Sequence, residues 1–228
     1  MKKNYLLILL LSPVFILHAQ NNNNDNPLND RKMIDRTSGN LLYIYQYEDV
    51  KGTPFLYDDW MPAIVIAYDN TMFKNMHLKF DVAGNEFIFK RNDTNYRVGP
   101  EATEIRMFSK NGDSIVFRNG FNINNAIRQS KYIQVLSEGK ITFLKYFRKN
   151  TEEYNEYGDA TKYKRFVEMY EYYTYKDNKS DPVRITKKEL ETLLSDKWDK
   201  VSQYMSQNNL SGKDEKSFAA AINYYNSL

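Results

Sequence analysis

The stretch YIQVLSEGKITFLKYF, residues 132–147, consists of two runs rich in β-branched and aromatic residues, separated by Glu138-Gly139. Such runs are typical of β-strands, and a glycine between two of them indicates a tight turn. The stretch therefore predicts an antiparallel hairpin with its turn near Gly139 and a long strand on each side.

Similar runs occur on both sides of this hairpin. The most regular is HLKFDV, in which Leu78, Phe80 and Val82 share one face of an extended chain. Turn signals such as Asn111-Gly112 separate the runs. We expect about nine or ten strands, and their close spacing favours antiparallel pairing because parallel strands need crossovers of a dozen or more residues. The other expected strands occupy residues 41–47, 63–68, 84–90, 114–118 and 165–176.

From Thr186 onward the apolar residues recur with a helical period. Thr186, with Glu189 three residues later, fits a helix N-cap; Ser195-Asp196 fits the start of a second helix, and Ser211 precedes the last one. Two or three short helices have too little core to fold alone, so we expect them to dock on the sheet. The apolar positions are Leu190, Leu193, Leu194, Trp198, Val201, Tyr204 and Met205, followed by Phe218, Ala221, Ile222 and Tyr225.

These patterns predict an α+β fold that is mainly β. We expect residues 41–185 to form an antiparallel meander or a half-open barrel. Residues 186–228 then form a C-terminal helical segment packed on it.

The chain begins with a pattern typical of a secretory signal peptide. Lys2 and Lys3 precede an apolar run of 13 residues, 5–17, and Ala19 fits the position before a cleavage site. We expect residues 1–19 to be removed and the Asn-rich residues 20–40 to be a disordered leader. The expected compartment is the periplasm or the extracellular space.

Composition excludes several classes of protein. Without Lys2 and Lys3 the chain has 30 basic and 29 acidic side chains, against 32 and 29 in the full sequence, so the net charge falls from +3 to +1. A nucleic-acid partner is not expected for so balanced a charge. Because the chain has no cysteine, it forms no disulfide framework and carries no lipid-modified cysteine anchor. No second apolar stretch approaches membrane-spanning length.

Catalytic and metal-binding patterns are weak. His77 is the only histidine after residue 19; it lies opposite the Leu78 face, and a zinc site would need further His or Cys ligands. Ser137 and Lys140 match a Ser-x-x-Lys pattern, but the expected hairpin turn explains these residues better. We therefore expect no catalytic residue, no metal and no cofactor.

The stretch GTPFLYDDW, residues 52–60, combines a chain break with aromatic and acidic residues. Asp58 and Asp59 are adjacent, so on an extended chain they point in opposite directions and do not form a carboxylate pair. We interpret the stretch as a corner in which Phe55 and Trp60 anchor the chain to the sheet, with the two aspartates solvated between them.

Four tyrosines in YEYYTY, residues 170–175, are the candidate binding residues. On a strand Tyr170 and Tyr172 share one face, and Tyr173 and Tyr175 share the other. Tyrosine is favoured at protein interfaces and at sugar-stacking surfaces, and it is also a common core residue beneath packed helices. The sequence leaves both interpretations open.

Several longer motifs resemble an uncharacterised family of secreted Bacteroidota proteins. They include GTPFLYDDW, MFKNMHLKFDVAGNEFIF, YIQVLSEGKITFLKYFRK and the C-terminal SDKWDKVSQYMSQNNLSGKDEKSFAAAINYYNSL. The copy departs from the family at Phe80-Asp81, where an Arg-Tyr-Asn type of sequence is expected. The resemblance implies export and a β-meander followed by short helices, and it implies no reaction.

The preferred functional hypothesis is a non-catalytic module of the bacterial envelope that binds a protein or glycan through aromatic surface. A first alternative is a carrier of apolar ligands, lipids among them, whose barrel cavity would be lined by Phe80, Phe87, Phe89 and Phe117. A second alternative is an enzyme of unrecognised type. The partner itself is unknown from sequence.

Overall fold

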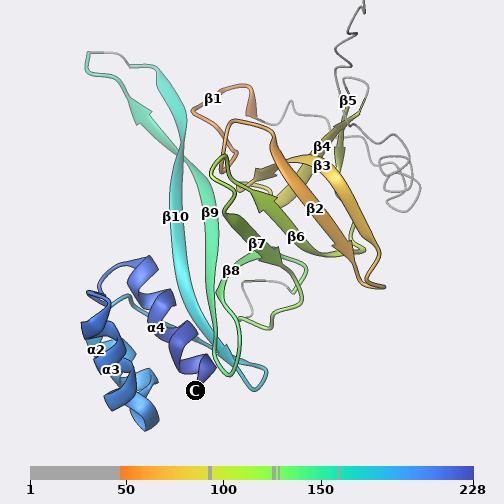
Figure 1. The fold of residues 1–228 in the computed structure, drawn as a ribbon. Coiled ribbons are helices and arrows are strands. Elements are labelled where there is room, and N and C mark those ends of the chain that lie inside the picture. Colours follow the sequence, from red (N-terminus) through yellow and green to blue (C-terminus); the bar gives the residue numbers. More distant parts are fainter. Residues whose placement is uncertain (1–46, 92–93, 125–126, 128, 159) are drawn as a thin grey trace, which may run out of the picture.

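The computed structural model describes residues 47–91, 94–124, 127, 129–158 and 160–228 (Figure 1). The expected signal peptide, the Asn-rich leader and the expected strand 41–47 up to residue 46 lie outside the described residues.

Eleven strands form one sheet. Its order is β1-β10-β9-β8-β7-β6-β2-β3-β4-β5, with β11 paired to β10. Every pair of strands is antiparallel except β1 with β10. The strands are β1 (Val50–Lys51), β2 (Met61–Ala67), β3 (Met72–Asp81), β4 (Glu86–Arg91), β5 (Thr94–Arg97), β6 (Ala102–Phe108), β7 (Ser114–Arg118), β8 (Ile133–Ser137), β9 (Thr142–Asn155), β10 (Lys162–Lys176) and β11 (Lys179–Pro182).

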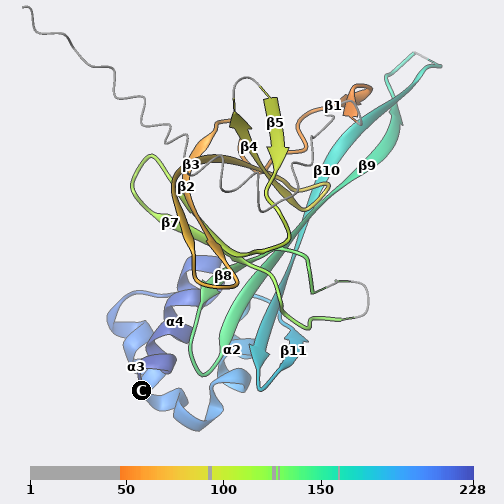
Figure 2. The same ribbon diagram turned by 90° about the vertical axis from the view of Figure 1, so that its right-hand side faces the viewer.

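The prediction of an α+β, mainly β fold with C-terminal helices is confirmed, and the sheet is open and does not close into a barrel. Strands β2 to β8 curl around a core, and the short connection 98–101 joins β5 to β6 across that curl (Figures 1 and 2). The order is not a simple meander, because β6 pairs with β2 instead of with β5. Strand β6 itself was not predicted, nor were β1, β5 and β11.

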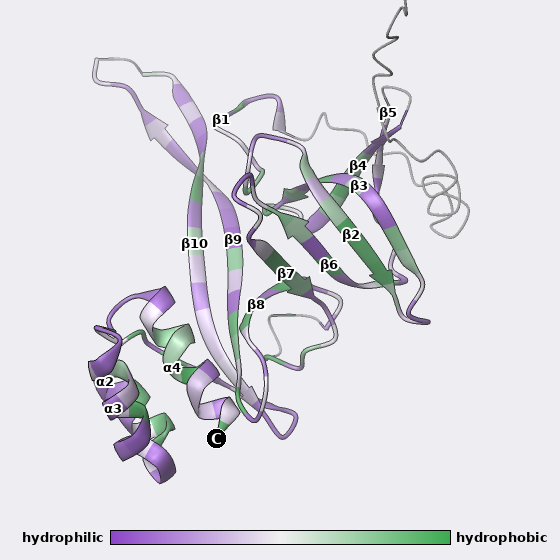
Figure 3. Ribbon diagram, viewed as in Figure 1, coloured by the Kyte–Doolittle hydropathy of each residue, from purple (hydrophilic) through white to green (hydrophobic). Residues whose placement is uncertain are grey.

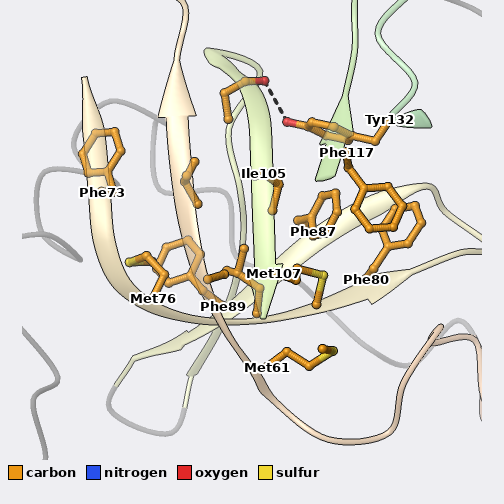
Figure 4. Close-up of a cluster of buried hydrophobic side chains, with 14 of the residues drawn as sticks. Met61, Phe73, Met76, Phe80, Phe87, Phe89, Ile105, Met107, Phe117 and Tyr132 are labelled. Carbon is orange, nitrogen blue, oxygen red and sulfur yellow. Dashed lines mark hydrogen bonds between the residues drawn. The ribbon is translucent and has the colours of Figure 1, made fainter. Parts of the chain in front are cut away.

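The inside of the curl is filled by aromatic rings (Figure 4). The Phe80 ring stacks on Phe87 with centroids 4.5 Å apart and lies 4.8 Å from the Phe117 ring. Tyr132 contributes a further ring, and its hydroxyl donates a hydrogen bond to the Ala102 carbonyl at 2.8 Å. Phe89 is buried in the same cluster. The four phenylalanines expected to line a carrier cavity therefore lie within a packed core.

Three helices follow the sheet, as predicted. They are α2 (Lys187–Leu193), α3 (Trp198–Gln207) and α4 (Glu215–Ser227), with a 3-10 turn, η2 (Ser195–Lys197), between the first two. Thr186 caps α2 by accepting a hydrogen bond from the Glu189 N–H, as expected. The last helix begins later than Ser211, because Asp214 is its cap. Within the described ranges, no helix is both long and apolar enough to cross a membrane.

The helices dock on one end of the β8–β9–β10 region (Figure 1). Most of the predicted apolar stripe is buried there, with Leu193, Trp198 and Tyr204 only partly covered. Phe143 on β9 contacts the Phe218 ring of α4 at a centroid distance of 4.9 Å. The fully buried positions are Leu190, Leu194, Val201, Phe218, Ala221 and Ile222.

Strands β9 and β10 are longer than the sequence predicted, and together they connect the two cores. On one face of β9, Phe143 belongs to the helical core and Phe147 to the curled-sheet core. The hairpin continues past both cores, and this far end is largely hydrophilic (Figure 3). Lys145 lies on the same face, between the two cores.

Candidate functional site

The four candidate tyrosines of β10 lie on two faces, as the strand period predicts. Tyr170 and Tyr172 lie opposite Phe147 and Lys145 of β9, on the face that carries both cores. Tyr173 and Tyr175 lie on the reverse face.

The reverse face is a packing surface. Tyr173 is only 6% exposed, and its hydroxyl donates a hydrogen bond to Glu171 Oε2 at 2.6 Å. Burial, with this carboxylate nearby, raises the pKa of Tyr173 to about 12. Tyr175 packs edge-on against the Phe121 ring at 5.2 Å. For this row the core interpretation holds.

The other row is divided between core and surface. Tyr172 is half-buried; its ring stacks on Phe143 at 5.5 Å, and its hydroxyl donates to Glu215 Oε2 at 2.7 Å. Burial, followed by the Glu215 contact, raises the pKa of the Tyr172 phenol well above its usual range. Tyr170 is 53% exposed. Of the four candidates, Tyr170 alone presents most of its ring to solvent.

Tyr170 is held in place by Lys145. The Lys145 ammonium lies 4.5 Å from the Tyr170 ring centroid and forms a 2.7 Å ion pair with Glu215 at the start of α4. The Lys145 side chain is only 14% exposed, so little of this ion pair is weakened by solvent. The rings of Tyr170 and Tyr172 also meet edge to face at 5.5 Å. These contacts fix the exposed ring in one position before any ligand binds.

The corner formed by residues 52–60 lies across the same face. Phe55 bridges to Asp81, and the Leu56 N–H donates to the Phe80 carbonyl, so the predicted corner on the sheet is present. Lys149 of β9 fastens it by donating hydrogen bonds to the carbonyls of Phe55, at 2.6 Å, and Thr53, at 3.2 Å.

Tyr57 belongs to this corner. Tyr57 is 42% exposed. Burial raises the pKa of its phenol, and the negative charges of Glu215 and Glu168 raise it further. Lys149, which pairs with Glu168 of β10, bonds to the Phe55 carbonyl two residues before Tyr57, so the corner lies beside the middle of β10.

An apolar pocket of about 400 Å³ lies on the other side of Tyr57. Trp60, Pro62 and Phe108 contribute to its wall, and the Asp59–Lys110 ion pair, 3.0 Å long, lies at its exposed rim. We call Tyr57, Trp60 and Tyr170 the aromatic surface. Tyr57 and Trp60 line the pocket, and Tyr170 contacts Lys145, the ion-pair partner of Glu215.

A second pocket, of about 460 Å³, lies at the end of the curled sheet. It is lined by loop residues around Gly84, Gly99 and Gly120. The two cations there are already engaged, because Lys131 donates to the Gly84 carbonyl at 2.9 Å and Arg97 pairs with Glu86 at 2.7 Å.

The other sequence candidates are not among the residues of the aromatic surface. His77 is exposed on β3, as the strand period predicted. Ser137 is buried, and its hydroxyl donates to Asn223 of α4 at 2.7 Å. The Ser-x-x-Lys residues form the predicted hairpin turn.

Sequence reasoning missed Tyr57, Lys145 and Glu215 as site residues. It interpreted Trp60 only as a structural anchor. In the structure the Lys79 ammonium lies 5.3 Å from the Trp60 ring, as for an anchor, and Trp60 also lines the apolar pocket. The available signal was the density of aromatic residues between Phe55 and Trp60.

Comparisons of the chain with protein-family models, with curated proteins and with solved structures find no match. The function is therefore inferred from the geometry of the site.

Proposed function

We propose that the protein is an exported, non-catalytic interaction module that binds a protein or glycan of the bacterial envelope through the aromatic surface. The observation that carries this proposal is the pair of exposed tyrosines, Tyr57 and Tyr170, in two distant segments that Lys149 joins through its bond to the Phe55 carbonyl and its ion pair with Glu168.

Rigid aromatic anchors support binding. Tyrosine offers a large contact area with few rotatable bonds, so it loses little entropy when it becomes ordered in a complex. Lys145 and Tyr172 already hold the Tyr170 ring, which lowers the cost of binding further. The neighbouring carboxylates supply polar contacts of the kind that orient a partner.

The export part of the proposal rests on residues 1–19, with their basic start and apolar run. The resemblance to secreted Bacteroidota proteins agrees with it. We propose the periplasm or the extracellular space as the compartment, without a cysteine-linked lipid anchor, because the chain has no cysteine.

The two alternatives receive less support. A carrier of apolar ligands requires space inside the curl, where Phe80, Phe87 and Phe117 contact one another. An enzyme requires an activated group. In the aromatic surface the Lys145 ammonium is paired with Glu215 and enclosed by rings.

Affinity capture with matched variants tests the proposal. The bait is the purified protein, and the sources are solubilised envelope and secreted material from the producing cells. Tyr57→Ser with Tyr170→Ser should reduce capture of a specific partner at least tenfold, because interface aromatics contribute about 2 kcal/mol or more each. Tyr68→Ser with Tyr157→Ser removes two other exposed tyrosines and is the control. Equal loss in both double variants would reject the aromatic surface as the site.

A further inference from the structure

Among the strands that the structure describes, β1 and β11 cover the two ends of the outer edge of β10 and none covers its middle. Strand β1 pairs with Lys164 and Arg165, and β11 pairs with residues 173–176. The Val183 N–H extends the second cover by donating to the Tyr172 carbonyl at 2.9 Å. Figure 2 shows β1 and β11 beside the two ends of β10.

The backbone groups that point out of this gap can be assigned. Successive residues of a strand direct their N–H and C=O groups to alternate edges. Tyr172 bonds outward to Val183, so Tyr170 and Glu168 also direct their groups outward, while Val167 and Met169 bond to β9. Among the described residues, no strand lies opposite Glu168 and Tyr170.

The side chains beside the gap are exposed enough to contact a bound partner. Tyr170 is exposed on one face, and Met169 is 36% exposed on the other. Glu168 lies next to Tyr170 on the first face, with a 41% exposed side chain. Its cation, Lys149, lies 3.4 Å away and bonds more closely to the Phe55 carbonyl, at 2.6 Å, so Glu168 retains capacity to accept from a partner.

The strands at the two ends of the gap, β1 and β11, limit which partner can pair with the edge of β10. The gap spans residues 166–171, about 20 Å of extended chain at 3.4 Å per residue. A second copy of this protein cannot pair through its own β10, because that strand has 15 residues and would overlap β1 or β11. A short extended segment fits this gap if its chain turns away from the edge of β10 at both ends.

We infer that the partner bound at the aromatic surface is a polypeptide, and that an extended segment of about six residues pairs with the open edge of β10. The segment places a Lys or Arg beside Glu168 and Tyr170, where the cation meets both a carboxylate and a ring, and an apolar side chain beside Met169. This inference rests on the proposed function and names the class of its partner.

A library of random heptapeptides displayed on phage, selected on the purified protein, provides the probes. The enriched peptides should share alternating apolar residues and one basic residue. Glu168→Lys should weaken the best peptide at least tenfold, because it places two cations together. Glu168→Gln, which keeps the shape and removes the charge, should weaken it less.

Amide hydrogen exchange, resolved by residue with NMR, identifies the binding mode. In the free protein the amides of Glu168 and Tyr170 should exchange rapidly, and those of Val167 and Met169 slowly. A selected peptide should slow exchange at Glu168 and Tyr170 at least tenfold. Slow exchange at these two amides in the free protein, no enriched peptide, or bound peptide without this protection would overturn the inference.

The two proposals fail separately. If oligosaccharides bind, no peptide does, and Tyr170→Ser abolishes binding, then the aromatic surface is a glycan site and the edge inference is wrong. If a peptide protects the Glu168 and Tyr170 amides with the same affinity for Tyr57→Ser and wild-type protein, the edge is the site and Tyr57 takes no part in binding.

Discussion

Asn226 of α4 and Ile141, in the turn before β9, are joined by two hydrogen bonds that imitate strand pairing. Asn226 Oδ1 accepts from the Ile141 N–H at 3.0 Å, and Asn226 Nδ2 donates to the Ile141 carbonyl at 2.8 Å. The side chain thereby satisfies both backbone groups of a buried residue in the predicted hairpin. The contact joins the helical segment to the sheet.

Asn226→Ala should lower the free energy of unfolding by about 1 to 3 kcal/mol, because it leaves the Ile141 N–H and C=O without partners. Urea denaturation measures the change. Ser227→Ala, next to it, removes only a local bond to the Tyr224 carbonyl and should change stability little. Equal stability of Asn226→Ala and wild type would show that the contact does not hold the helices.

The close approach of Gly139 to Asn226 leads to a second prediction for the same junction. A Cβ at Gly139 would lie 2.5 Å from Asn226 Cγ, whereas one at Gly112 would have nothing within 4 Å. Gly112→Ala should lower the free energy of unfolding by about 1 kcal/mol, because alanine is strained in the backbone conformation of Gly112. Gly139→Ala should lose a further 1 to 3 kcal/mol by displacing Asn226. Thermal or urea unfolding of the pair tests this, and equal losses would contradict the close contact.

Asp214, the N-cap of α4, predicts a pH dependence. Hydrogen bonds from the Ser217 hydroxyl and N–H, and from Ser211, lower the pKa of Asp214 from 3.8 to about 2. The stabilisation by ionised Asp214 is therefore complete above pH 3.8 and is lost as the pH falls through about 2. Asp214→Asn keeps an amide cap without titrating.

Denaturant titrations of wild type and Asp214→Asn between pH 6 and 2.5 provide the measurement. The wild type should be more stable by a constant amount down to about pH 4, and the difference should then shrink. A difference that stays constant over the whole range, or one that grows in acid, would contradict the assigned hydrogen bonds.

The two rows of tyrosines should differ in their effect on stability. Tyr173→Ser should cost about 3 kcal/mol or more, because it empties a buried site and leaves Glu171 and Asn124 without the hydroxyl. Tyr170→Ser should stay within about 0.5 kcal/mol, as for most surface substitutions. Thermal unfolding separates them, and a large loss from Tyr170→Ser would make this residue part of the core.

Much of the fold was accessible from sequence because its signals are local. The hairpin around Gly139 and the helical stripe from Leu190 to Met205 depend on period and turn chemistry within a few residues. Strand β6 was missed because its apolar alternation is short, with only Ile105 and Met107 alternating with Glu104 and Arg106. In the fold Glu104 accepts hydrogen bonds from Arg106 and from Arg118 on the neighbouring strand, which allows a buried carboxylate.

The site was only partly accessible, because it depends on contacts between distant segments. The strand period assigned Tyr170 and Tyr173 to opposite faces, but it gave no indication of which face was covered. The position of Tyr57 beside the middle of β10 follows from the hydrogen bonds by which Lys149 fastens the corner to the sheet. Neither feature leaves a pattern within one stretch of sequence.

Photo-crosslinking in the producing cells tests the aromatic surface most directly. A benzoylphenylalanine placed at Tyr170 or Tyr57 should give one discrete adduct, to the same partner from both positions. The same probe at Tyr157, which is fully exposed at the turn between β9 and β10, should not give it. Absence of an adduct at Tyr170 and Tyr57, or the same adduct at all three positions, would contradict binding through the aromatic surface.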